Sequence, residues 1–429
     1  MIQKRVNLLC ILMMGLFAVS LAACADETNG DPIDGDVDCD VTPDDPACEK
    51  TDDKVDCRET PEADECLVRQ RVDKYNERRC PELKEAANAN LRFEEKFKNH
   101  MNARNMSNVF NKSYGEDTLV HPGEAQVIKG RFWSNNDNIP GGGKGPEGEE
   151  VAIFRQKDDG TWEILAEAVT DNRGSYEAEV SEADRFERGK HRILSILKAD
   201  GTCVEHGVFV FEENFETILT DIDATLTTAD EEMIEQMLGP KGLEYVPHKL
   251  DGAVEYTNAY DNKGFLMLYL SARPVDYLSW TRIWLREEGF PYGPSKGAPN
   301  LVFGSTAASY KKGYVEHILN DLSWKILYGY GNAFSDVDGY VDGGIPKDKV
   351  YMVNEAGCPE DSVDLECTCY VGSAESKCEK FTDLDTTPYA EQDGVAYRGT
   401  IAIKPNKSYS EHIEAWINPH ADSNTPHNQ

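Results

Sequence analysis

Two kinds of hydrophobic pattern divide the chain. Between about residues 124 and 213, short runs of alternating apolar and polar residues are separated by turns such as Asp158-Asp159-Gly160. This spacing predicts an antiparallel β-sandwich of the immunoglobulin-like type, because a period of two buries one face of each strand. The expected strands are Gln126 to Trp133, Val151 to Gln156, Trp162 to Val169, Ser175 to Val180, His191 to Leu197 and Gly207 to Phe211.

From Phe215 onward, apolar strand-like runs alternate with helical stretches. This order predicts a parallel, doubly wound α/β sheet, since parallel strands are joined by crossover helices. The expected strands are Thr217 to Thr220, Phe265 to Leu270, Leu301 to Phe303, Lys325 to Tyr330 and Val350 to Val353. The expected helices are Glu231 to Leu238, Val275 to Glu288 and Tyr310 to Leu322.

The first 23 residues belong to neither domain. Lys4 and Arg5 precede an apolar run, and Leu21-Ala22-Ala23-Cys24 follows it. We interpret residues 1–23 as a lipoprotein signal peptide that resembles those of bacteria, with Cys24 as the acylated residue; an ordinary signal peptide cut near Ala23 is the alternative. The expectation is an exported lipoprotein, anchored by lipid to a bacterial membrane and facing the periplasm or the cell surface.

Composition sets the remaining boundaries. Residues 24–66 form an acidic, Cys-containing tether, which cannot fold alone because it has almost no large apolar side chains. Residues 67–112 read as a helical segment, 113–213 as the sandwich, 214–357 as the α/β domain and 358–429 as a Cys-rich, irregular extension. The formal net charge of −34 disfavours nucleic acid as a partner.

The cysteines predict disulfides. The chain has 12, and setting aside Cys10 and Cys24 leaves ten, five in each half. In an exported protein an even number favours disulfides, and two odd halves require a bridge between them if all are oxidised. Eight of the cysteines form two clusters in the sequence, and neither cluster contains the C-x-x-C pairs of zinc sites. The clusters are Cys39, Cys48, Cys57 and Cys66, and Cys358, Cys367, Cys369 and Cys378. We predict Cys80 with Cys203 as the bridge between the halves.

Polar residues gather where the predicted parallel strands end. Asp221, Asp223 and Thr225 follow the first strand of the α/β domain. Other groups follow later strands or belong to a neighbouring helix: Ser271, Arg273, Lys311, Lys312, Asn332 and Asp336. Because the carboxyl ends of parallel strands meet at one sheet edge, we expect these side chains to converge.

Hydrolysis of a phosphomonoester needs such a set. One aspartate attacks phosphorus to form an acyl phosphate, and a second carboxylic acid moves protons for the leaving group and the attacking water. Magnesium, held by hard oxygen ligands, neutralises the phosphoryl oxygens. Hydroxyl and ammonium groups bind the remaining charge.

The motifs resemble those of the haloacid dehalogenase superfamily in their order along the chain. More narrowly, Asp221-Ile-Asp223-Ala-Thr225, Ser271-Ala-Arg273 and Gly331-Asn-Ala-Phe-Ser-Asp336 are similar to the catalytic domain of lipins, which are magnesium-dependent phosphatidate phosphatases. The resemblance implies a haloacid-dehalogenase-like fold without a large cap. Related domains in phosphatidylinositol-transfer proteins lack the second motif aspartate and are thought to bind phosphatidate without turnover.

The resemblance also implies roles. Asp221 would be the nucleophile and Asp223 the general acid and base. Mg²⁺ would be held by Asp221, Asp223, Asn332 and Asp336, and phosphate by Thr225, Ser271, Arg273 and either Lys311 or Lys312. Ala224 replaces a usual glycine, which is tolerable unless that position needs a positive φ.

The leading hypothesis from the sequence is therefore an enzyme: a magnesium-dependent phosphatase for phosphatidate or a related phosphomonoester, with an open site. The alternatives are a non-catalytic module that binds phosphatidate, and a phosphatase for small soluble phosphomonoesters. The presence of Asp223 favours turnover.

Overall fold

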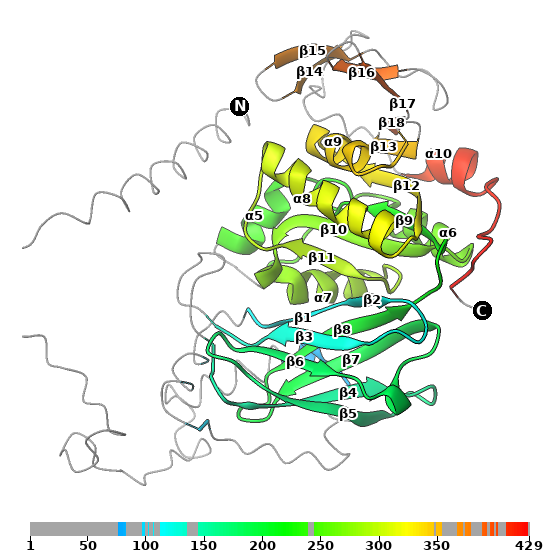
Figure 1. The fold of residues 1–429 in the computed structure, drawn as a ribbon. Helices are drawn as coiled ribbons and strands as arrows, with labels where there is room; N and C mark the ends of the chain where they lie inside the picture. The colour runs from blue at the N-terminus through cyan, green and yellow to red at the C-terminus, as the bar shows by residue number, and fades with distance from the viewer. Residues whose placement is uncertain are drawn as a thin grey trace, which may run out of the picture. The chain divides into compact units, whose positions relative to one another are not determined.

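The computed structural model describes residues 76–82, 97–98, 102, 106, 112–134, 145–238, 244–346, 349–353, 367–371, 374–378, 388–392, 395–398, 400–401 and 409–427 (Figure 1). The predictions for the signal peptide, for Cys24 and for the acidic tether lie outside these residues. All described residues belong to the unit Glu62–Gln429. No helix among them is long and apolar enough to cross a membrane.

The first domain is a β-sandwich, as predicted. Its strands are β1 (Tyr114–Glu116), β2 (Thr118–Val120), β3 (Val127–Arg131), β4 (Glu150–Gln156), β5 (Trp162–Val169), β6 (Ser175–Glu179), β7 (Gly189–Leu197) and β8 (Cys203–Val210), with the turn η2 (Glu182–Asp184). One sheet has the order β2-β8-β7-β4-β5 and the other β1-β3-β6. Buried Ile128, Ile153 and Val208 help to fill the core between them. The six predicted strands are present, whereas β1 and β2 were not predicted.

The second domain is built on a parallel sheet, also as predicted. Its strand order is β11-β10-β9-β12-β13-β18, which places β9 at the centre. The strands are β9 (Glu216–Thr220), β10 (Leu266–Pro274), β11 (Ser295–Ala298), β12 (Lys325–Gly331), β13 (Val350–Val353) and β18 (Thr400–Ile401). Apolar side chains alternate between the two faces: Leu266 and Leu268 enter one core cluster and Met267 the other.

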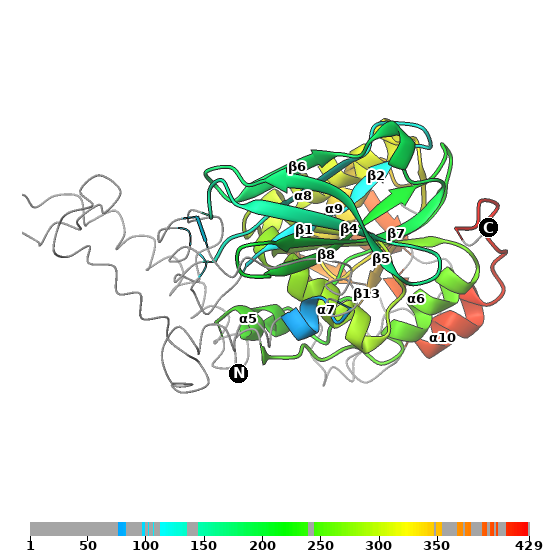
Figure 2. The same ribbon diagram turned by 90° about the horizontal axis from the view of Figure 1, so that it is seen from below.

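Helices cover both faces of this sheet. They are α5 (Glu231–Leu238), α6 (Ala253–Asn262), η4 (Val275–Tyr277), α7 (Leu278–Glu288), α8 (Gly304–Glu316), the π-helical turn η5 (His317–Asp321) and α9 (Phe334–Asp342). Side chains of α8 and α9 enter one core cluster, and those of α6 and α7 the other. Helix α7 also faces the sandwich, where Ser279 Oγ donates to Ser113 O at 2.7 Å (Figures 1 and 2).

Two local predictions were wrong. Leu301 to Phe303 is not a strand; the edge strand is Ser295–Ala298, and Leu301 instead packs against Met233 and Trp280. The apolar run from Leu301 to Phe303 is therefore part of a loop, and Leu301 packs that loop against the helices. The helix expected to begin at Tyr310 starts earlier, because α8 begins at Gly304.

The region after residue 358, predicted to be irregular, contains regular elements. They are β14 (Cys367–Val371), β15 (Ala374–Cys378), β16 (Pro388–Gln392), β17 (Val395–Arg398), α10 (Ser410–His412) and the π-helical turn η7 (Ile413–Ile417). Strand β18 extends the parallel sheet beside β13. Residues 409–417 join the core on the α6 face, where the rings of Tyr409 and Tyr256 stack 4.2 Å apart.

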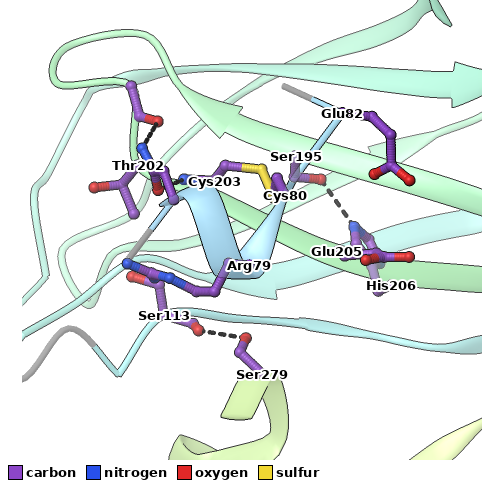
Figure 3. The surroundings of a disulfide bond; sticks show 12 residues. Arg79, Cys80, Glu82, Ser113, Ser195, Thr202, Cys203, Glu205, His206 and Ser279 are labelled. Carbon is purple, nitrogen blue, oxygen red and sulfur yellow. Dashed lines mark hydrogen bonds between the residues drawn. A yellow bond between two sulfur atoms is a disulfide. The ribbon is translucent and has the colours of Figure 1, made fainter. Parts of the chain in front are cut away.

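The predicted disulfide between Cys80 and Cys203 is confirmed (Figure 3). It links a short helical turn, residues 76–79, to strand β8, across a sequence separation of 123. Asn76 lies in the same turn and binds the β7–β8 connection through Gly201 O at 2.7 Å. The bridge therefore fixes a segment from before the sandwich onto it.

Candidate functional site

Four segments bring the predicted polar residues together at one edge of the parallel sheet. Asp221 and Asp223 follow β9, and Ser271 and Arg273 lie in β10. Lys311 comes from α8 and Asp336 from α9. We call Asp221, Asp223, Ser271, Arg273, Lys311 and Asp336 the carboxylate site. All six are buried, with exposed fractions of 0–7%. The expected convergence is therefore observed, while the role of each residue stays a prediction.

Lys311 joins two of the carboxylates. Its Nζ donates to Asp221 Oδ1 at 2.8 Å and also to Asp336 Oδ1. Lys312 does not reach the site, since its Nζ pairs with Glu316 on the helix surface at 3.8 Å and its side chain is 42% exposed. Of the two candidate lysines, the structure places only Lys311 among the carboxylates.

Asp336 is fixed by backbone groups as well. Its Oδ2 accepts hydrogen bonds from the backbone N–H groups of Asn332 and Ala333, each at 2.9 Å. Glycine is required at residue 331, because a Cβ there would lie 2.3 Å from Asp336 Cβ. Asn332 itself is buried, and it contributes this backbone donor to the site. Asp336 thus lies in the first turn of α9.

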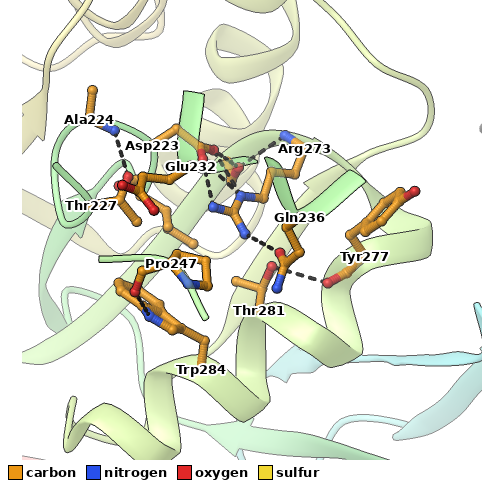
Figure 4. A network of polar contacts seen from close by, with 12 residues as sticks. Asp223, Ala224, Thr227, Glu232, Gln236, Pro247, Arg273, Tyr277, Thr281 and Trp284 are labelled. Atoms are coloured by element: carbon orange, nitrogen blue, oxygen red, sulfur yellow. Dashed lines mark hydrogen bonds and ion pairs between the residues drawn. The ribbon is translucent and has the colours of Figure 1, made fainter. Parts of the chain in front are cut away.

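Asp223 is held from two sides (Figure 4). Arg273 Nε and Nη2 lie 2.8 and 2.7 Å from its Oδ1, and Ser271 Oγ donates to its Oδ2 at 2.8 Å. Arg273 in turn donates from Nη1 to Gln236 Oε1 at 3.0 Å. Gln236 was not predicted; its signal in the sequence is a polar residue at a buried position of α5, the helix that follows the first motif.

The loop between Asp223 and Thr225 is strained. Ala224 adopts φ 51°, the positive value that the usual glycine would take without cost. The Ala224 N–H donates to Thr227 Oγ1 at 2.9 Å. Tyr409, from the C-terminal segment, donates to the Thr225 carbonyl at 2.8 Å. Within the described part of the chain, the buried Thr225 hydroxyl has no hydrogen-bond partner.

The site is rich in negative charge. Burial raises the pKa of Asp221 well above its usual range; Lys311 opposes this, and the carboxylates of Asp336 and Asp223 add to it. Burial alone would lower the pKa of Lys311, but Asp221 and Asp336 outweigh it and raise that pKa. Three carboxylates therefore face two cations, which favours entry of further positive charge.

The donor set suits magnesium in part. Asp221 and Asp336 are hard oxygen donors of the kind that Mg²⁺ prefers, and both lie beside the Lys311 ammonium group. The third predicted carboxylate, Asp223, faces Arg273 and Ser271 instead. In the described ranges, no group of three or more His, Cys, Asp and Glu side chains is arranged to hold a metal ion.

Two family models match the chain. Residues 218–354 match the LNS2 domain of PITM 1-3, and residues 112–210 match the β-sandwich domain of PITM 1-3. The matches cover the α/β domain and the sandwich respectively, in the order in which the structure shows them.

Curated relatives agree with these models. The chain is 23% identical over 255 residues to Protein retinal degeneration B of Drosophila melanogaster, covering 59% of this chain and 19% of the relative. It is 23% identical over 252 residues to human Membrane-associated phosphatidylinositol transfer protein 2, covering 58% and 17%. The chain thus spans about a fifth of the length of these relatives. A class C acid phosphatase from Bacillus anthracis, solved with tungstate bound, aligns at 18% identity with a TM-score of 0.23, which does not establish a shared fold.

These comparisons correct the resemblance inferred from the motifs. The α/β domain is similar to the LNS2 domain of membrane-associated phosphatidylinositol transfer proteins, and not to a lipin-type catalytic domain in a bacterial lipoprotein. The motif order could not separate the two, because the motifs that we compared contain the site residues and little of the surrounding domain. The two family models together make the distinction, because residues 218–354 and the preceding sandwich both match the same group of proteins.

Proposed function

We propose that the α/β domain is a lipid-binding module that recognises the phosphomonoester head group of an anionic lipid such as phosphatidate. The observation that carries this proposal is the state of Asp223. Both of its oxygens already accept hydrogen bonds from Arg273 or Ser271, and all three residues are buried. In this arrangement Asp223 has no free oxygen with which to protonate a leaving group.

The remaining groups suit binding. The orphan Thr225 hydroxyl can donate a hydrogen bond to a phosphate oxygen, and Lys311 supplies buried positive charge. Asp221 and Asp336 would hold Mg²⁺, which would neutralise the phosphoryl oxygens when bound. A dianionic monoester satisfies more of these donors than a phosphodiester does, so the site should discriminate between them.

The relatives point in the same direction. Several are named as membrane-associated phosphatidylinositol transfer proteins, so a lipid or a membrane is a plausible partner of this chain. An acyl group on Cys24, as predicted from the sequence, would keep the chain at a membrane surface.

Hydrolysis is the second candidate, and one observation favours it. Asp221 and Asp223 occupy the alternate positions that an aspartyl-phosphate mechanism uses, at the carboxyl end of the central strand. Turnover through Asp223 would require its separation from Arg273. Hydrolysis of a small soluble phosphomonoester would need the same separation.

Calorimetric titration tests the proposal. Dihexanoyl phosphatidate should bind in the presence of Mg²⁺, whereas dihexanoyl phosphatidylcholine, a phosphodiester with the same acyl chains, should not. Phosphate release from dihexanoyl phosphatidate and from p-nitrophenyl phosphate is measured in parallel and should be absent. Equal binding of the two lipids, or of neither, would contradict recognition of the monoester. Release that Asp221→Asn abolishes would establish the phosphatase instead, and the better substrate would separate a lipid from a soluble ester.

A further inference from the structure

Two large apolar side chains are exposed in the α/β domain, on segments that contact helix α5 or begin helix α8. Phe303 is 63% exposed and Val246 46% exposed. Two other exposed apolar residues, Ile164 and Val169, lie on strand β5 of the sandwich. A single exposed apolar residue is ordinary, but two that flank the same helix at a ligand site suggest an interaction surface.

The topology places Phe303 at the site edge of the sheet. Strand β11 is parallel to β10, so the chain that leaves Ala298 emerges at the edge where Ser271 and Arg273 lie. Phe303 then caps the N-terminus of α8, which also carries Lys311. Eight residues of helix correspond to about 12 Å along its axis. Phe303 therefore lies within reach of a ligand held near Lys311.

Helix α5 connects the two exposed side chains to the site. Leu301, two residues before Phe303, packs against Met233 and other side chains in the α5 and α7 cluster. Tyr245, next to Val246, donates from its hydroxyl to Glu232 Oε2 at 2.7 Å. The same helix contributes Gln236, which binds Arg273. Phe303 and Val246 thus belong to segments that contact the helix bordering the site.

We propose that Phe303 and Val246 form an apolar rim that inserts into the surface of a lipid bilayer while the carboxylate site holds a lipid phosphomonoester. This inference rests on the proposed function. A lipid bound by its phosphate keeps its acyl chains in the bilayer, so the bilayer must approach this edge of the domain. A net charge of −34 opposes approach to an anionic membrane, and burial of apolar side chains supplies the compensating attraction.

Vesicle binding of residues 24–429, the chain without its predicted signal peptide, tests the rim. All proteins carry Cys24→Ser, which removes the predicted acyl attachment. The vesicles are phosphatidylcholine with a minor fraction of phosphatidate, and bound protein is measured by co-flotation. We expect Phe303→Asp to weaken binding about tenfold or more, because a buried phenyl ring is lost and a charge is added. Val246→Asp should weaken it less. Val169→Asp is the matched control, since Val169 is 59% exposed but lies on the sandwich.

Soluble lipid separates failure of the rim from failure of the site. Phe303→Asp should bind dihexanoyl phosphatidate with the wild-type affinity, because a soluble lipid needs no bilayer insertion and Phe303 is not one of the residues of the carboxylate site. If the wild type binds neither soluble lipid nor vesicles, the proposed function fails. If the wild type binds both and Phe303→Asp floats with vesicles equally well, the rim is overturned. Equal weakening by Val169→Asp would also overturn it, and self-association abolished by Phe303→Asp would assign the surface to a second copy of the chain.

Discussion

Two clusters of charge, one partly buried and one buried throughout, serve different ends in this molecule. At the junction of the sandwich with α7, Glu205 accepts hydrogen bonds from Arg192 at 2.7 Å and from Arg286. Arg192 also binds Glu82 at 3.0 Å, so two carboxylates face two guanidinium groups. The carboxylate site places three carboxylates against Lys311 and Arg273. The first cluster is balanced by its own side chains, whereas the second lacks positive charge.

Backbone conformation also differs between the sandwich and the carboxylate site. Among the described residues of the sandwich, only glycines adopt a positive φ. At the carboxylate site Ala224 does so, and the buried Thr225 hydroxyl beside it lacks a hydrogen-bond partner in the described structure. Strain, an orphan donor and unbalanced charge each cost stability, and their occurrence in one loop is typical of a binding site.

Removal of Lys311 should have the largest effect on the charge balance of the carboxylate site. In Lys311→Met, Asp221 and Asp336 lose the ammonium group between them and become buried carboxylates without that ion pair. We expect a loss of about 3–5 kcal/mol in the free energy of unfolding, as is typical when one partner of a buried ion pair is removed. Binding of dihexanoyl phosphatidate should also be lost. Denaturant unfolding and calorimetric titration measure the two effects.

The neighbouring residue provides the control. Lys312→Met removes the same charge from the same helix, but Lys312 is 42% exposed and pairs only at 3.8 Å with Glu316. Exposed pairs of this kind contribute little, so stability and binding should stay near wild type. Equal effects of the two substitutions would show that net charge, rather than the buried contact of Lys311, determines binding.

Acid should weaken the sandwich through His206. This side chain is buried, with its ring nitrogens bound to Ser195 Oγ and Glu116 O, and burial lowers its pKa to about 4. The unfolded state takes up a proton near pH 6.5 and the native state only near pH 4, so stability falls as the pH drops between these values. The loss should be on the order of 2–3 kcal/mol.

Amide hydrogen exchange in β7 and β8, corrected for the intrinsic effect of pH, measures this loss. In His206→Gln the loss between pH 6.5 and pH 4 should be smaller than in the wild type by that amount. The same slope in both proteins would mean that carboxylates, and not His206, determine the acid sensitivity of the sandwich.

The sequence predicts the sandwich and the carboxylate site to different extents. In the sandwich, alternation located strands such as β3 and β6, whose buried residues alternate. Short runs between turns located β4, β5, β7 and part of β8, which is buried along its whole length. Strands β1 and β2 have three residues each, too few to show a period. Helix α6 was missed because its buried residues include Tyr256, Thr257 and Tyr260, whose polar groups conceal the apolar face.

At the carboxylate site, motif spacing predicted which residues converge but not their pairing. Whether Asp223 faces a ligand or Arg273 depends on a rotamer and on Gln236, a residue from a segment without a motif. The choice between Lys311 and Lys312 depends on the rotation of α8, which the position of α9 and the sheet determines. Contacts with the C-terminal segment, such as that of Tyr409 with Thr225, join residues 184 positions apart and leave no local pattern.

The strain at Ala224 offers the smallest and most selective test. Ala224→Gly relieves a positive φ that costs alanine about 1–2 kcal/mol, while the unfolded chain gains about 0.5–1 kcal/mol of entropy. We expect a net stabilisation of about 0.5–1 kcal/mol in denaturant unfolding. Ser323 has the same φ of 51° away from the site, so Ser323→Gly is the matched control. Only Ala224→Gly should also weaken phosphatidate binding, because a more flexible loop must be ordered on binding. If both substitutions stabilise the protein and neither changes affinity, the strain at Ala224 has no part in binding.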